Sequence, residues 1–181
     1  MSTSELLDGL EAIDHFLAAQ PFAVRQLHPP ASMQALEATA AKLRIEIPEI
    51  VRTMYRWRDG AVPEPGGREL FLFPPYWQYM PLSWVEKESE GPLAWCRAIG
   101  VAGFPVARDP AGQFLVVQSG SQDVLLEAAY DGVAAAWPDG TMLGMVNATR
   151  QALAGEHVEF EAVFSAHRME WVFPDRESGN D

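Results

Sequence analysis

The chain has 181 residues, enough for one domain that buries roughly 70% of its unfolded surface, and its 48% hydrophobic and 21% charged residues are typical of a globular protein. The formal net charge of −12 argues against direct nucleic-acid binding, because phosphate backbones are also negative. No apolar run approaches the ~20 residues that cross a bilayer, and MSTSELLDGL lacks the pattern of a signal peptide. We therefore expect no membrane contact and a cytoplasmic location.

Three helices are predicted in the first third of the chain. Apolar residues recur at helical spacing from about Ser4 to Gln20, where Pro21 should end the helix, and again from Ser32 to Leu43. A third helix is expected to begin at Pro48, and Gly60 suits the left-handed residue that ends a helix. The connection between the second and third helices is short, which predicts a hairpin of helices.

The next part of the chain is rich in aromatic residues. RELFLF, from Arg68 to Phe73, is a short apolar run between Gly67 and Pro74, which predicts a strand. The following segment, PPYWQYMPL, either forms a sticky surface loop or packs into the core, and its composition fits both. Ser83 has capping-box spacing to Glu86, which predicts that SWVEKESE is a helix with an acidic outer face.

From Phe104 onward the pattern changes to that of consecutive hairpins. FPVARDPAGQFLVVQSG predicts two strands joined by a turn at 109–112, and 123–129 predicts a third strand. Asp131-Gly132 is a further hairpin signal, after which 133–137 should pair back. A helix from 141 to 153 follows. Consecutive hairpins imply an antiparallel meander with helices on one face or end, so the expected class is α+β.

The order of these motifs resembles that of the SUKH superfamily. PPASMQALEATAAKLRIEIPEIVRTMYRWRDG, residues 29–60, has the Pro-Pro lead-in, a helix ending in an "IP" step, and a second helix closing on an aromatic residue and "DG". The later strand, turn and strand and the closing helix continue the likeness, which covers about 29–153. The resemblance implies one SUKH-like domain over 1–174, with N-terminal helices on a mainly antiparallel sheet and a further helix after it. Residues 175–181 are expected to fray.

The resemblance also implies a function. Bacterial SUKH members are immunity proteins, so we expect this chain to bind a cognate secreted toxin domain, such as a nuclease or another nucleic-acid- or protein-modifying enzyme, and to occlude its active site. Eukaryotic relatives act in cell-wall regulation through protein partners. An acidic surface would suit a basic partner. Acidic and aromatic residues chosen for composition and position are the partner-binding candidates: Trp57, Asp59, Glu64, Tyr76, Trp77, Glu86, Glu88 and Glu90.

No catalytic residue, metal or cofactor is predicted. No phosphate-binding loop, nucleophile elbow or HExxH helix occurs. Cys96 is the only cysteine, which excludes a cysteine zinc cluster, and His157 and His167 fit no common metal-ligand spacing. Four aspartates that could act as acid or base, at 109, 123, 131 and 139, all lie near predicted turns, where Asp is expected for backbone reasons. The alternative is an enzymatic or small-ligand-binding domain with a pocket between helices and sheet.

Overall fold

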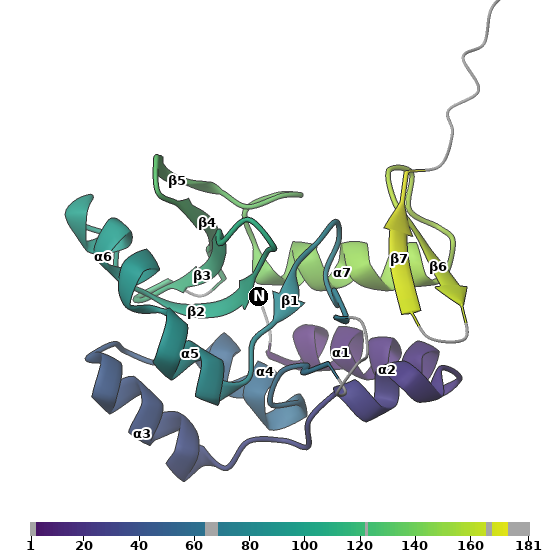
Figure 1. The fold of residues 1–181 in the computed structure, drawn as a ribbon, viewed down its shortest axis with the longest axis horizontal. Coiled ribbons are helices and arrows are strands. Elements are labelled where there is room, and N and C mark those ends of the chain that lie inside the picture. The colour runs from purple at the N-terminus through teal and green to yellow at the C-terminus, as the bar shows by residue number, and fades with distance from the viewer. Residues whose placement is uncertain (1–2, 64–68, 122, 166–167, 174–181) are drawn as a thin grey trace, which may run out of the picture.

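Four helices begin the chain, and the apolar stripe of the first one, α1, lies in the core. The computed structural model describes residues 3–63, 69–121, 123–165 and 168–173 (Figure 1). The four helices are α1 (Thr3–Ala18), α2 (Pro21–Gln26), α3 (Met33–Leu43) and α4 (Glu49–Trp57). The apolar stripe of α1 is fully buried. The Ser32 side chain caps α3 by accepting a hydrogen bond from Ala35 N at 3.1 Å, as its position before the apolar stripe predicts.

Two helix boundaries differ from the sequence-based expectation. Pro21 does end the first helix, but it also occupies the first turn of α2, where a missing N–H costs nothing. Gly60 has a φ of +74°, in the left-handed region, yet α4 already ends at Trp57. The left-handed residue therefore turns the chain after the helix rather than capping it. The predicted strand at 68–73 is wrong for the described residues 69–72, which form no strand; Phe73 makes one isolated bridge, to Trp77.

The main sheet is an antiparallel meander of five strands in chain order. They are β1 (Gln78–Tyr79), β2 (Gly103–Arg108), β3 (Phe114–Gln118), β4 (Leu125–Ala129) and β5 (Gly132–Ala135). The turn between β2 and β3 is held by Asp109, whose Oδ1 accepts a hydrogen bond from Gln113 N at 2.8 Å. Gly112 supplies the left-handed residue of that turn, with a φ of +84°. The predicted hairpins are confirmed because their signals are local.

The helix predicted from 83 to 90 is two helices. They are α5 (Leu82–Glu88) and α6 (Glu90–Ala98). Pro81 precedes α5, and no side chain caps it, so the capping-box interpretation of Ser83 is wrong. The N-terminus is instead held by Asp59, whose Oδ1 accepts a hydrogen bond from Leu82 N at 2.8 Å. A partner distant in sequence has replaced the local one.

The chain closes with one more helix and a separate hairpin. These are α7 (Met142–Leu153), β6 (Glu161–Ser165) and β7 (Arg168–Val172). Thr141 caps α7 by accepting from Gly144 N at 2.9 Å. The hairpin is pinned to the aromatic-rich segment, because Trp171 Nε1 donates to the Phe71 carbonyl oxygen at 2.7 Å. The tail therefore docks on the domain through residue 172.

Aromatic residues join α4 to the sheet at the centre of the molecule. Tyr55 and Tyr79 are fully buried, with ring centroids 5.5 Å apart. Their hydroxyl groups donate to the carbonyl oxygens of Met80 at 2.9 Å and Arg58 at 2.8 Å. Burial raises the pKa of both tyrosines well above the ordinary value, so both remain neutral hydrogen-bond donors. Figure 1 shows helices α1, α3 and α4 below the sheet, and the fold is a single α+β domain.

Candidate protein-binding face

A groove of about 510 Å³ runs between β7 and the segment from Glu69 to Tyr76. It exists because the Trp171 hydrogen bond to Phe71 holds the hairpin beside this segment while leaving a gap between their side chains. Residues from both walls are Phe71, Pro75, Tyr76, Met169, Glu170 and Trp171. A smaller hollow of about 270 Å³ shares Glu69 and Phe71 with the groove and extends toward Arg108. The two hollows adjoin at these shared residues and are together called the depression.

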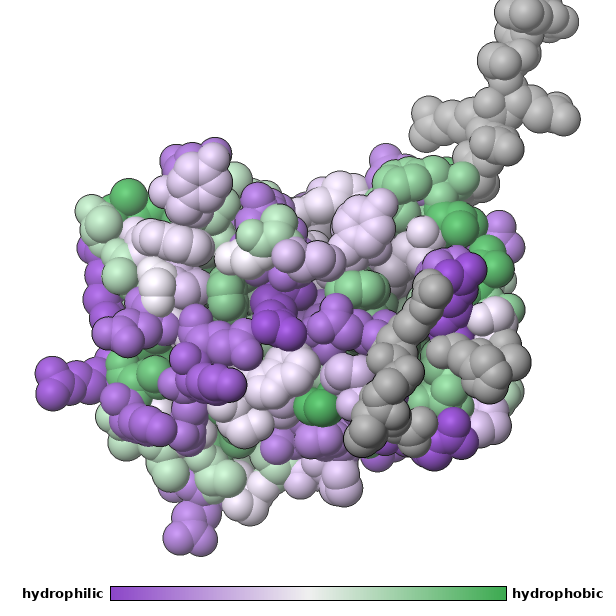
Figure 2. Space-filling model, in the orientation of Figure 1, coloured by the Kyte–Doolittle hydropathy of each residue, from purple (hydrophilic) through white to green (hydrophobic). Residues whose placement is uncertain are grey.

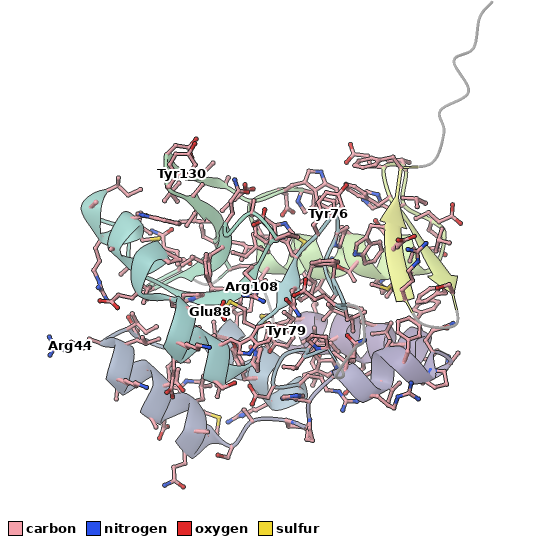
Figure 3. All side chains as sticks on the ribbon, viewed as in Figure 1. Arg44, Tyr76, Tyr79, Glu88, Arg108 and Tyr130 are labelled. Carbon is pink, nitrogen blue, oxygen red and sulfur yellow. The ribbon has the colours of Figure 1, made fainter. Side chains whose placement is uncertain are left out.

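Tyr76 is the aromatic side chain at the rim of this groove. Phe73 and Trp77 exchange backbone hydrogen bonds of 3.0 Å and 2.9 Å, closing a tight turn over the three residues between them, the last of which is Tyr76. Tyr76 is consequently 49% exposed. Figure 3 shows it on the same upper side of the molecule as Tyr130, which lies in the β4–β5 turn and is 82% exposed. An exposed tyrosine beside a groove is a typical interface anchor.

Arg108 fills the end of the depression and is already paired. Its guanidinium contacts the Glu88 carboxylate and lies 3.6 Å from Glu69 Oε1 and 4.3 Å from the centre of the Trp84 ring. Figure 3 shows Glu88 and Arg108 close together above α5. Two carboxylates around one guanidinium leave a net negative charge, so this end of the depression suits a cationic group better than an anion.

Two of the predicted aromatic residues lie in the core. Trp57 is 7% exposed and stacks on Tyr79 with ring centroids 6.2 Å apart, and Trp77 is 6% exposed. Both side chains pack inside the domain and are not part of an exposed surface in this structure. Of the aromatic candidates, Tyr76 alone is exposed. Because of the tight turn, Tyr76 points outward and its neighbour Trp77 points inward.

The predicted acidic face of 86, 88 and 90 does not form. Glu90 is exposed but begins α6, whereas the other two belong to α5 and point to different neighbours. Glu86 accepts hydrogen bonds from Lys42 Nζ at 2.7 Å and Thr39 Oγ1 at 2.8 Å, and these bonds lower its pKa. Glu86 therefore fastens α5 to α3, while Glu88 holds Arg108.

The two remaining predicted residues are Asp59 and Glu64. Asp59 is half-buried, and one of its carboxylate oxygens accepts a hydrogen bond from the backbone at the start of α5. Glu64 lies outside the described residues. Of the predicted partner-binding residues, Tyr76 lines the groove and Glu88 lines the smaller hollow. The sequence reasoning missed Glu69, Glu170 and Trp171, because nothing local marks residues that meet only in the folded chain.

A second feature was also missed, although it is legible in the sequence. Between Arg108 and Arg150 there is no lysine, arginine or histidine, and this stretch contains the five acids Asp109, Asp123, Glu127, Asp131 and Asp139. It folds into the turn before β3, the strands β3 to β5, and the start of α7. This stretch therefore adds five negative charges and no positive charge to the strands and turns that it forms.

The polar groups with a shifted pKa do not converge on the groove. Burial raises the pKa of Asp123 and Glu127, and Asp123 also caps α7 by accepting from Met142 N at 3.0 Å. Burial likewise raises the pKa of the Cys96 thiol, which favours the unreactive protonated form. Among the described residues, no three His, Cys, Asp or Glu side chains are grouped so that they could hold a metal ion.

Comparison with known proteins adds no relative. No protein-family model matches the chain, and no curated protein matches it. Within the described part of the chain, none of the helices has the length and apolar character to span a membrane.

Proposed function

We propose that this chain is a SUKH-like immunity protein that binds a basic toxin domain and occludes its active site. The observation that carries the proposal is an exposed tyrosine, Tyr76, on the rim of a groove whose walls are mainly apolar. Tyrosine supplies contact area at low entropic cost, and unpaired surface acid attracts a basic partner from a distance. Together these properties give a surface that binds another protein.

The charge distribution supports a basic partner. The net charge is −12, and the acid-only stretch between Arg108 and Arg150 begins at Asp109, which lines the smaller hollow. Figure 2 shows that hydrophilic residues cross the middle of one face and that apolar ones gather over β6 and β7. Apolar patches together with a negative field suit a toxin domain that binds nucleic acid, because the surface of such a domain is basic.

The alternative of an enzyme or small-ligand binder has less support. A catalytic pocket is expected to bring together polar groups whose pKa is shifted, and the groove at β7 contains an Arg168–Glu170 ion pair of 2.7 Å among apolar side chains. The carboxyl groups with a raised pKa, at 123 and 127, do not line this groove. Its walls are suited to contact rather than to proton transfer.

The test is co-expression of this chain with the variable C-terminal domain of a large secreted protein encoded beside its gene. We expect growth to be restored and the two proteins to purify together, with about tenfold or greater loss of affinity in Y76A. The control is I99A, which removes a side chain that is 57% exposed at the end of α6 and does not line the groove. Failure of the wild-type chain to protect cells, or turnover of a substrate by the purified chain alone, would refute the proposal.

A further inference from the structure

The strand β5 is an uncovered edge of the main sheet. The strand order places β5 last, with β4 as its neighbour in the sheet. Figure 1 shows it at the outer margin, in the upper part of the view. Three of its four residues are exposed, and Val133 is half-buried. An edge of this kind leaves a row of backbone groups open to another chain.

The direction of each backbone group follows from the register. Ala129 pairs with Gly132 across the two-residue turn, and Ala136 N donates to Leu125 O at 3.1 Å. In an antiparallel ladder, alternate residues direct their N–H and C=O groups to the same neighbour. Gly132 and Ala134 thus face β4, and Val133 and Ala135 face outward. Within the described residues, no hydrogen bond from outside the ladder reaches these outward groups.

Natural proteins usually protect such an edge, and β5 lacks charged residues, proline and a bulge, although it is short, with four residues. Its sequence, Gly-Val-Ala-Ala, contains no lysine, no other charge and no proline. Its pairing with β4 runs through consecutive residues without a bulge. An uncharged edge strand can add another strand, because backbone hydrogen bonds supply the affinity.

The charge around β5 selects the occupant. Asp131 lies directly before the strand and Asp139 shortly after it, both exposed, in the stretch that has no cation. A second copy of this chain would bring like charges together, whereas a lysine- or arginine-bearing strand would meet opposite ones. Tyr130, 82% exposed beside Asp131, offers a ring over which such a cation can rest.

We propose that β5 pairs with an extended, basic segment of the partner protein and so adds a sixth strand to the sheet. This inference deepens the proposed function and rests on it, because it names the part of the surface that holds the partner's backbone. The groove at Tyr76 and the edge at β5 then serve different purposes. Side chains are recognised at the first and the main chain at the second.

The test uses a fluorescein-labelled synthetic peptide of four Lys-Val repeats and the full-length protein. We expect saturable binding, with slowed hydrogen exchange at the Val133 and Ala135 amides, and much weaker binding of the Glu-Val counterpart. A135P removes an outward N–H and should weaken binding about tenfold or more. A135S retains the N–H and is the matched control. Unchanged affinity in A135P, or unprotected amides at 133 and 135, would overturn the proposal.

Two substitutions of opposite charge at Ala135 test the charge of the segment that pairs with β5. A135K should weaken binding of the Lys-Val peptide and A135E should strengthen it, since only the sign differs. Sedimentation tests whether the occupant is instead a second copy of this chain. A dimer that both substitutions dissociate would overturn the choice of a basic partner. Toxin neutralisation that survives A135P refutes the β5 inference alone. Peptide binding at β5 without neutralisation refutes the proposed function alone.

Discussion

Replacing Gly60 by alanine tests how tightly the turn after α4 is built. Gly60 has a φ of +74°, where a Cβ costs about 1–2 kcal/mol. A Cβ there would also lie 2.1 Å from Pro81 N and 2.4 Å from the Met80 carbonyl carbon, both backbone atoms that cannot rotate away. Overpacking of this kind typically adds about 1–3 kcal/mol. We therefore expect G60A to lower the free energy of unfolding by about 2–5 kcal/mol.

The control is G112A, which separates the cost of a Cβ in the left-handed backbone region from the cost of its close approach to other atoms. Its φ of +84° is similar, but a Cβ there would meet no atom within 4 Å. G112A should therefore lose only the first contribution, about 1–2 kcal/mol. Urea unfolding followed by tryptophan fluorescence measures both variants against the wild type, with the midpoints compared at a common slope. If G60A is no less stable than G112A, the close approach to Pro81 is not real and the reasoning fails.

Three further changes test the ion pairs, the docked hairpin and the rim. The Lys42 hydrogen bond lowers the pKa of Glu86 in the folded state, so this carboxylate stabilises the fold above its unfolded pKa and loses that effect as pH falls through the folded pKa. E86Q should therefore reduce the loss of unfolding free energy between about pH 6 and about pH 3 by about 0.5 kcal/mol, measured by urea titration. W171F should cost about 1–2 kcal/mol and speed amide exchange in β7, since the Phe71 carbonyl loses its donor; unchanged exchange would contradict this. Y76A should shift the melting temperature by less than about 2 °C, because the side chain is half-exposed, and a larger shift would mean that Tyr76 is structural.

The parts of the fold predicted correctly are those that local chemistry decides. The cap at Ser32 and the turns at Gly112 and Asp131-Gly132 depend on residues within a few positions of one another. The α+β class follows from those hairpins and from the apolar stripes of α1 and α3. Each such signal is complete in a short window, so an isolated sequence is enough to read it.

The errors arise where distant residues compete with a local pattern. Ser83 has capping-box spacing, yet Asp59 holds the start of α5 from 23 positions away. Glu86 looks solvated on a helix face, but Lys42 binds it across a separation of 44 residues. The groove depends on a hydrogen bond between residues 100 positions apart, from Trp171 to Phe71. Periodicity carries no information on such pairs, so the candidate site was only partly predictable.

The internal ion pairs also change which acids steer a partner. Lys42, Arg58 and Arg108 each hold a carboxylate of this chain, so those carboxylates contribute little field to the surroundings. Between Arg108 and Arg150 the sequence has five acids and no cation, so the charge of this stretch is locally negative. D131K and E90K each replace one exposed acid by a lysine and change the net charge equally. If the local field governs encounter, D131K slows association with the partner several-fold more than E90K and lowers its salt dependence more, in stopped-flow measurements. Equal slowing by both would show that net charge alone attracts the partner and that the acid-only strands have no special place in recognition.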